Sequence, residues 1–189
     1  MKKIENKKKF WKNILIDIVE NVDSHQDVVV KKEKEFIIIK DKFPKSKYHF
    51  LVIPHQDINS VTDIKHAHLP LLIKMKEAAV ELSKEFDTEF ETKYGFHLLP
   101  SLNRLHLHVI TQDFESNSLT RNKRKFFFFL IFFFFFLIFL LIDWFSFTTK
   151  LFVEIDFVIQ QLTDNKELVF YGEEEMKELE NGKEFLCNR

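Results

Sequence analysis

The sequence predicts an α+β fold in which an antiparallel sheet of about five strands packs under one long amphipathic helix, with a second, short helix at the N-terminus. Two observations support this prediction. Short apolar segments alternate with brief polar connections, which is typical of a strand meander. One later segment carries apolar residues at helical spacing, and this apolar stripe needs a sheet to cover. The length of 189 residues suits one domain with a short extension.

The first half of the chain is expected to contain a short helix and three strands. Apolar residues recur at helical spacing over about 11–21, which predicts the N-terminal helix. Residues 28–30, 36–39 and 48–53 are rich in β-branched and aromatic side chains, and Pro54 ends the last of these segments. Their short connections indicate a meander.

The second half is expected to supply the long helix and two more strands. Apolar residues step by three and four from Leu72 to Phe86, and Pro70 can begin this helix without losing a hydrogen bond. Strands are expected at 96–99 and 105–111, joined by a turn that begins with a proline.

The last of these strands has two alternating sets of side chains. Successive side chains of a strand point to opposite faces, so Leu105, Leu107 and Val109 are expected to enter the core. The opposite face would then present a guanidinium and two imidazoles together, from Arg104, His106 and His108. A solvated strand face with incidental histidines and a metal-binding His-x-His pair are the alternative interpretations.

Charge and cysteine content bound the function only loosely. The formal net charge of −1 neither demands nor excludes a nucleic acid partner, because basic and acidic stretches alternate along the chain. Cys187 is the single cysteine, and no apolar signal segment follows the lysine-rich first residues. Both observations favour a reducing compartment, the nucleus or the cytoplasm.

The segment Phe126–Ile142 is anomalous because it consists entirely of Phe, Leu and Ile and follows a basic stretch. Its length approaches the roughly 20 apolar residues of a membrane span, but it lacks small residues for helix packing and interrupts an otherwise soluble sequence. Runs of Phe also result when a pyrimidine-rich intron end is translated. We therefore interpret 124–143 as a foreign insert, a retained intron, rather than a membrane span or a buried helix. Beyond it, apolar residues from Phe152 to Leu162 fit a helix face.

Two segments resemble the signature regions of the histidine-triad (HIT) superfamily. They are Asp41-Lys-Phe-Pro-Lys-Ser-Lys-Tyr-His-Phe-Leu-Val-Ile-Pro54 and Pro100-Ser-Leu-Asn-Arg-Leu-His-Leu-His-Val-Ile110. Within the superfamily, the first segment and Gln112-Asp-Phe-Glu-Ser116 resemble the aprataxin branch. Removing the insert would join Asn122-Lys123 to Trp144-Phe-Ser-Phe, which is similar to a stretch of that branch.

The resemblance implies a HIT-like fold and removal of AMP from 5′-adenylated DNA, the product of abortive ligation, during single-strand break repair. It makes His106 the nucleophile that forms a covalent histidine-AMP intermediate, and neutral imidazole is nucleophilic near pH 7. The residues that would stabilise the phosphates are His108, His97, His49, Lys45 and Ser101, and Asp41 would hold the ribose hydroxyls. Arg104 stands where the superfamily has its first histidine, and it would bind phosphate, add positive potential there, or lower the activity.

The resemblance also implies contacts to DNA and a set of domains. The DNA-binding residues would be His55, Gln56, Asp57, Ile58, Asn59, Glu115, Ser116 and Lys123. The expected domains are a catalytic domain over 1–123, the insert over 124–143, and a helical extension over 144–189 that leads into a truncated zinc finger. Zinc is expected in intact relatives, but no cofactor or metal is expected here, because Cys187 alone cannot form a tetrahedral site.

Two alternative functions remain open from the sequence. One is a general HIT nucleotide hydrolase acting on AMP phosphoramidates or dinucleoside polyphosphates. The other is a membrane-attached nucleotide-binding protein without catalysis, in which Phe126–Ile142 is a genuine anchor. The expected partners of the favoured function are 5′-adenylated DNA, AMP as product, and DNA repair proteins.

Overall fold

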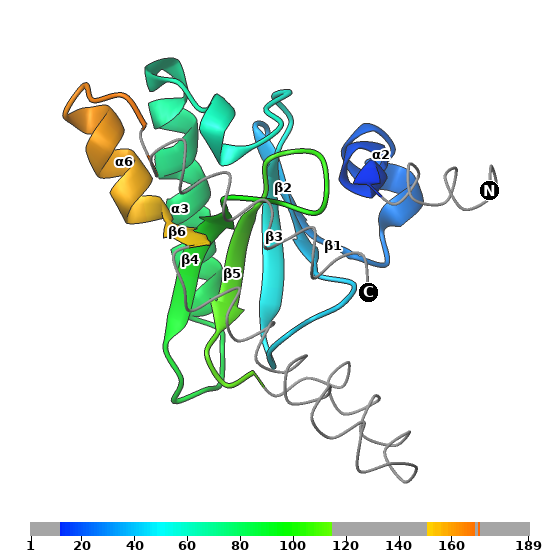
Figure 1. Ribbon diagram of the computed structural model, residues 1–189. Helices are drawn as coiled ribbons and strands as arrows, with labels where there is room; N and C mark the ends of the chain where they lie inside the picture. The colour runs from blue at the N-terminus through cyan, green and yellow to red at the C-terminus, as the bar shows by residue number, and fades with distance from the viewer. Residues whose placement is uncertain (1–11, 115–150, 169, 171–189) are drawn as a thin grey trace, which may run out of the picture.

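A computed structural model describes residues 12–114, 151–168 and 170. Six strands form one antiparallel sheet in the order β1-β2-β3-β5-β4-β6 (Figure 1). The strands are β1 (Val29–Lys32), β2 (Phe36–Lys40), β3 (His49–Pro54), β4 (Thr92–His97), β5 (Leu107–Thr111) and β6 (Phe152–Glu154). The helices are α2 (Ile14–Glu20), α3 (Leu69–Ser83) and α6 (Ile155–Thr163), with short 3-10 turns at Val22–His25, Val61–Asp63 and His66–His68.

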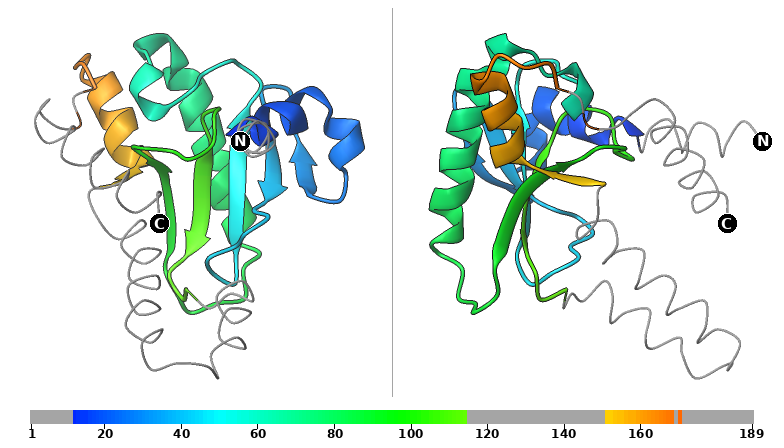
Figure 2. Two further views of the ribbon diagram at one scale, coloured as in Figure 1. Left: turned by 45° about the vertical axis from the view of Figure 1, so that its right-hand side comes forward. Right: turned by 60° about the vertical axis from the view of Figure 1, so that its left-hand side comes forward.

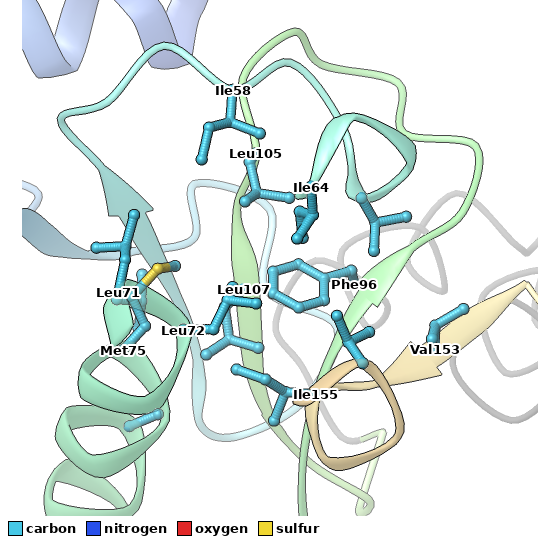
Figure 3. Packing of buried hydrophobic residues seen from close by; sticks show 14 of the residues in the cluster. Ile58, Ile64, Leu71, Leu72, Met75, Phe96, Leu105, Leu107, Val153 and Ile155 are labelled. Atoms are coloured by element: carbon cyan, nitrogen blue, oxygen red, sulfur yellow. The ribbon is translucent and has the colours of Figure 1, made fainter. Parts of the chain in front are cut away.

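Helices α3 and α6 lie on one face of the sheet (Figures 1 and 2). Helix α3 buries residues three and four apart, namely Leu71, Leu72, Met75 and Ala79, so its apolar stripe faces the strands as predicted. Figure 3 shows this core, in which Leu107 lies between Leu72 of α3 and Phe96, and Leu105 lies next to Ile58 and Ile64. The alternation predicted for 105, 107 and 109 is confirmed, because all three aliphatic side chains are buried here.

Helix α2 covers the opposite face, over β2 and β3, with Val29 of β1 at the margin of the cluster. Its Leu15 and Ile18 pack against Ile37, Leu51 and Ile53, which are the alternate residues of those strands. On the same face, at the other edge of the sheet, Ile110 and Phe152 form a smaller cluster with Phe114. The part of the sheet between these two clusters carries the histidines.

The predicted five strands become six, because the chain forms a strand where a helix was expected to begin. Phe152–Glu154 pairs with β4 in antiparallel register, Gly95 opposite Glu154 and His97 opposite Phe152. Only from Ile155 does the chain become helical, with Ile155, Val158 and Leu162 buried. Strand β4 likewise differs from the predicted 96–99, because its residues 92–95 bond to β5 and its residues 95–97 bond to β6.

Strand β6 and helix α6 belong to the same folded unit as residues 12–114. Val153, Ile155, Val158 and Leu162 are part of the core beneath α3. The chain leaves the described region at Phe114, which packs near Phe152, so it returns close to the point where it left. The proposed insert 124–143 lies outside the described residues. Among the helices that the structure describes, none is long and apolar enough to cross a bilayer.

Candidate active site

Four histidines gather on the sheet face between the two smaller clusters, three of them from strands β3, β4 and β5 and His106 from the residue before β5. The ring centroid of His108 lies 5.2 Å from that of His49, 4.5 Å from that of His97 and 4.9 Å from that of His106. His108 is therefore the centre of the cluster. The antiparallel register explains this, because residue 108 lies opposite Leu51 on β3 and Gly95 on β4. His49 and His97 are each two residues from those positions, on the same face.

The hydrogen bond of His106 determines which of its nitrogens carries the proton. Its Nδ1 lies 2.8 Å from the backbone carbonyl oxygen of Arg104, and a carbonyl oxygen only accepts. Nδ1 therefore bears the hydrogen, and in the neutral ring Nε2 keeps its lone pair. The side chain is only 7% exposed, so this orientation is fixed by the protein around it. An imidazole held in this way presents a nucleophilic nitrogen.

His108 has the opposite tautomer, set by a relay through His49. The backbone N–H of Lys45 donates to Nδ1 of His49 at 3.2 Å, so the proton of His49 sits on Nε2. That Nε2–H donates to Nδ1 of His108 at 2.9 Å. Neutral His108 must then carry its own proton on Nε2. The cluster thus combines a nitrogen lone pair on His106 with an N–H donor on His108.

Asp41 completes the cluster from the turn before β3. Its Oδ1 accepts the backbone N–H of Phe43 at 2.7 Å, and its Oδ2 lies 3.6 Å from Nε2 of His49. Asp41, His49 and His108 are close enough to hold a metal ion. A metal would need the lone pair of Nε2 of His49, whereas the Lys45 N–H places a proton on that nitrogen. The geometry therefore favours a hydrogen-bond relay over a metal site.

Burial keeps the two central histidines neutral. It lowers the pKa of His106 below the ordinary value of 6.5, against the opposing effects of the Arg104 carbonyl and the charge of Asp41. It lowers the pKa of His108 well below that value, with further lowering from His97, His106 and His49. Both rings are thus uncharged at pH 7, as the two tautomers require.

Comparisons with known proteins agree with this geometry. The profile of the family described as the scavenger mRNA decapping enzyme C-terminal binding region matches residues 13–124. The chain belongs to this histidine-triad family. Two relatives named aprataxin, from Danio rerio and Ciona intestinalis, are 35% and 32% identical over 153 and 139 residues. These alignments cover 79% and 72% of this chain but 41% and 32% of the relatives, so the chain spans less than half of their length.

A solved structure confirms the histidine-triad fold. The crystal structure of the aprataxin ortholog Hnt3 in complex with DNA superimposes with a TM-score of 0.56, covering 81% of this chain and 76% of that chain. Its sequence identity of 24% supports the fold. The fold class expected from the two signature segments is therefore confirmed.

Arg104 lines the same small hollow as His106 and His97, but its guanidinium is not presented together with the imidazoles as expected. Its backbone has φ of 87°, so the extended alternation begins only after it, and β5 starts at Leu107. The buried guanidinium instead donates to the carbonyl oxygens of Pro54 and His55 and pairs with Asp57 at 3.1 Å. Arg104 therefore ties the loop after β3 to the strand that carries the nucleophile, and it is a positioning residue.

Replacing Arg104 with alanine should lower the free energy of unfolding by about 1–3 kcal/mol, because the Pro54 carbonyl oxygen loses its donors in a buried site. Arg104→Gly removes the same side chain but fits the left-handed backbone, so it should be less destabilising than Arg104→Ala. Urea unfolding of both variants measures the difference. Equal stability of Arg104→Ala and the unchanged chain would show that the hydrogen bonds of the Arg104 side chain contribute nothing to stability.

Of the remaining predicted site residues, Lys45 and Asn59 lie at the histidine cluster, whereas Ser101 and His55 make no contact with it that the structure shows. Lys45 contributes its backbone amide to His49, and Ser101 is exposed in the loop before the nucleophile. Asn59 lines a small hollow beside His106 and His97, so it lies at the nucleophile. The Nε2 atom of His55 lies 3.1 Å from the Glu33 carbonyl oxygen.

One predicted DNA-binding residue is a core residue instead. Ile58 is 3% exposed and packs beneath the sheet, so its side chain cannot contact DNA. The resemblance implied a DNA contact from the loop that contains Ile58, but its apolar side chain fills the core next to Leu105 (Figure 3). Gln56 and Asp57 are exposed as expected. Glu115, Ser116, Lys123 and Cys187 lie outside the described residues.

Two residues near the triad were missed by the sequence analysis. Gly95 and Phe152 flank His108 from the strands β4 and β6. A lone glycine within a strand often marks a close approach of another chain segment, and that signal was present. No local signal identifies Phe152, because its pairing partner lies far away in the sequence.

Proposed function

We propose that this protein hydrolyses the adenylate from 5′-adenylated DNA by way of a covalent histidine-AMP intermediate on His106. The observation that supports this most directly is the pair of opposite tautomers, a lone pair on Nε2 of His106 next to an N–H on Nε2 of His108. Nucleophilic substitution at phosphorus needs both an attacking lone pair and a donor for the negative oxygens. The DNA substrate is proposed from the similarity to aprataxins.

In the first step, Nε2 of His106 attacks the adenylate phosphorus. A P–N bond forms while the bond to the bridging oxygen breaks, and the DNA 5′-phosphate leaves with the electron pair. The ring becomes a cation, which the Arg104 carbonyl and the charge of Asp41 stabilise. His108 donates its Nε2–H to a phosphate oxygen, and the relay from Lys45 through His49 keeps that proton in place.

In the second step, water attacks the same phosphorus and the P–N bond breaks. AMP leaves with the new oxygen, the remaining proton of the water passes to solvent, and His106 recovers its lone pair. Nδ1 of His106 keeps its hydrogen and donates it to the Arg104 carbonyl oxygen throughout, so the ring does not have to turn between the steps.

A direct comparison of substrates tests this proposal. We expect turnover of nicked DNA carrying a 5′-adenylate to exceed that of an AMP phosphoramidate and of a dinucleoside polyphosphate under the same conditions. Faster turnover of the small nucleotides would instead favour a general histidine-triad nucleotide hydrolase. Nucleotide binding without turnover of any of the three would favour the binding protein without catalysis. For a DNA repair substrate we expect the protein in the nucleus rather than the cytoplasm, which imaging of the tagged chain can check.

The histidine cluster predicts a loss of stability in acid. In the folded chain, burial lowers the pKa values of His106 and His108 below 6.5, whereas in the unfolded chain these rings titrate near 6.5. Unfolding therefore takes up protons in this range, so stability is complete above pH 6.5 and falls as the pH drops towards the lowered pKa values. Urea unfolding between pH 8 and 5 measures this slope, and His108→Gln should make it shallower. An unchanged slope in that variant would contradict the assignment.

A further inference from the structure

Phe152 reaches the histidine cluster from the last strand of the sheet. Its ring centroid lies 5.8 Å from that of His97, at an interplanar angle of 75°, and 6.3 Å from that of His108, at 58°. Edge-to-face contacts in this range are the favoured geometry of aromatic pairs. The residue is 9% exposed, so its ring is held between the imidazoles and Ile110.

The Phe152 ring can occupy this position because residue 95 is a glycine and has no side chain. Gly95 lies directly opposite His108 on β5 and opposite Glu154 on β6. A Cβ atom at this position would lie 2.6 Å from Cε1 of Phe152 and 2.5 Å from the carbonyl oxygen of Val153. Both distances are too short for carbon, so any side chain here would push β6 and the ring away. Glycine at 95 and phenylalanine at 152 thus form one packing unit next to the cluster.

In the part of the chain that the structure describes, the ring of Phe152 lies on the side of His108 that faces the β6 edge of the sheet. Asp41 and His49 approach His108 from the β3 side, and His106 and His97 approach from β5 and β4. Lys93 and Glu154 lie on the same sheet face towards the edge, where they pair with each other at 4.0 Å. The apolar ring of Phe152 lies between this edge and His108 and separates His108 from solvent on that side.

We propose that Phe152 is a positioning residue, whose ring, admitted by Gly95, orients His97 and His108 and keeps water away from His108. The inference concerns the same site as the proposed function, and the activity part of its test rests on that function. The orientation of the imidazoles does not depend on the substrate. The lowered pKa of His108, caused mainly by burial, agrees with a dry environment on this side.

Two variants of the full-length chain test the inference by NMR of labelled histidines and by steady-state kinetics. Phe152→Leu keeps an apolar side chain but removes the aromatic edge contacts, so the His97 and His108 signals should shift and kcat should fall roughly 2- to 10-fold with KM little changed. Phe152→Ala removes the ring and lets water reach His108, so the pKa of His108 should rise towards 6.5. Gly95→Ala should reproduce the signal shifts of Phe152→Leu, because it displaces the same ring.

Phe90→Leu is the matched control. Phe90 lies in the turn before β4, away from Phe152, and it is 55% exposed. Its replacement should leave the histidine signals and kcat unchanged. Unchanged histidine signals in folded Phe152→Leu and Phe152→Ala would overturn the inference, and so would loss of folding in Phe152→Leu, which would assign the ring to stability alone. Shifted signals in a chain that hydrolyses no adenylate would refute the proposed function while leaving the positioning role intact.

Discussion

Replacing His106 with alanine is expected to abolish AMP release, with a fall in kcat of roughly 10³-fold or more, because the side chain that forms the P–N bond is removed. His106→Asn is expected to behave in the same way. Asparagine can donate to the Arg104 carbonyl as Nδ1 does, but its amide nitrogen has no lone pair available for attack. Loss of activity in this variant would therefore separate nucleophilic catalysis from simple positioning.

Trapping the intermediate gives the direct measurement. Brief incubation with DNA that carries a labelled adenylate, followed by denaturation, should leave label on the unchanged chain through an acid-labile bond. Neither His106 variant should retain label. His66→Ala is a suitable control, because His66 is an exposed histidine in the turn before α3 and is remote from the cluster. Normal turnover by His106→Ala would end the hypothesis of histidine-triad catalysis.

Ending the chain at Lys123 is expected to prevent folding, whereas removing only Arg124–Asp143 should leave the fold and the activity intact. The truncation removes five buried side chains, from Phe152, Val153, Ile155, Val158 and Leu162. Burial of each such side chain contributes about 1.5–3 kcal/mol. Their sum is as large as the whole stability of a typical domain, about 5–15 kcal/mol. The truncated chain should therefore show no cooperative unfolding transition.

The internal deletion has a different outcome because the chain leaves and re-enters the fold at neighbouring points. Phe114 packs with Ile110 and Phe152, so a shorter connection can still join the two described parts. Removing the Phe-rich run should also increase solubility, since a long exposed apolar segment promotes aggregation. Thermal unfolding and AMP release measure both expectations.

A chain that ends after Phe170 is the matched control for the truncation at Lys123. It keeps β6 and α6, so it should unfold cooperatively. If the chain without Arg124–Asp143 is insoluble, while the full chain is folded and active in detergent, then the Phe-rich segment is a genuine membrane anchor. Sequencing the spliced transcript addresses the same question independently.

Much of the fold could be predicted from the sequence because the relevant signals are local. The period-two pattern at Leu105, Leu107 and Val109 identifies the core face of β5, and helical spacing identifies α3. The resemblance to the histidine triad added the roles of the four histidines, which the structure brings together. These features follow from residues a few positions apart.

The tertiary structure alone decided the features that depend on distant parts of the chain. A left-handed backbone at Arg104 turns its side chain to Pro54 and His55, and no alternation pattern reports that angle. Strand β6 forms because β4 offers a free edge, and three residues by themselves show no clear strand signal. The tautomers of His106 and His108 depend on backbone groups that only the fold places beside them. Local periodicity therefore determines which face of an element is buried, whereas hydrogen-bond partners and edge pairing are set by contacts between segments far apart in the sequence.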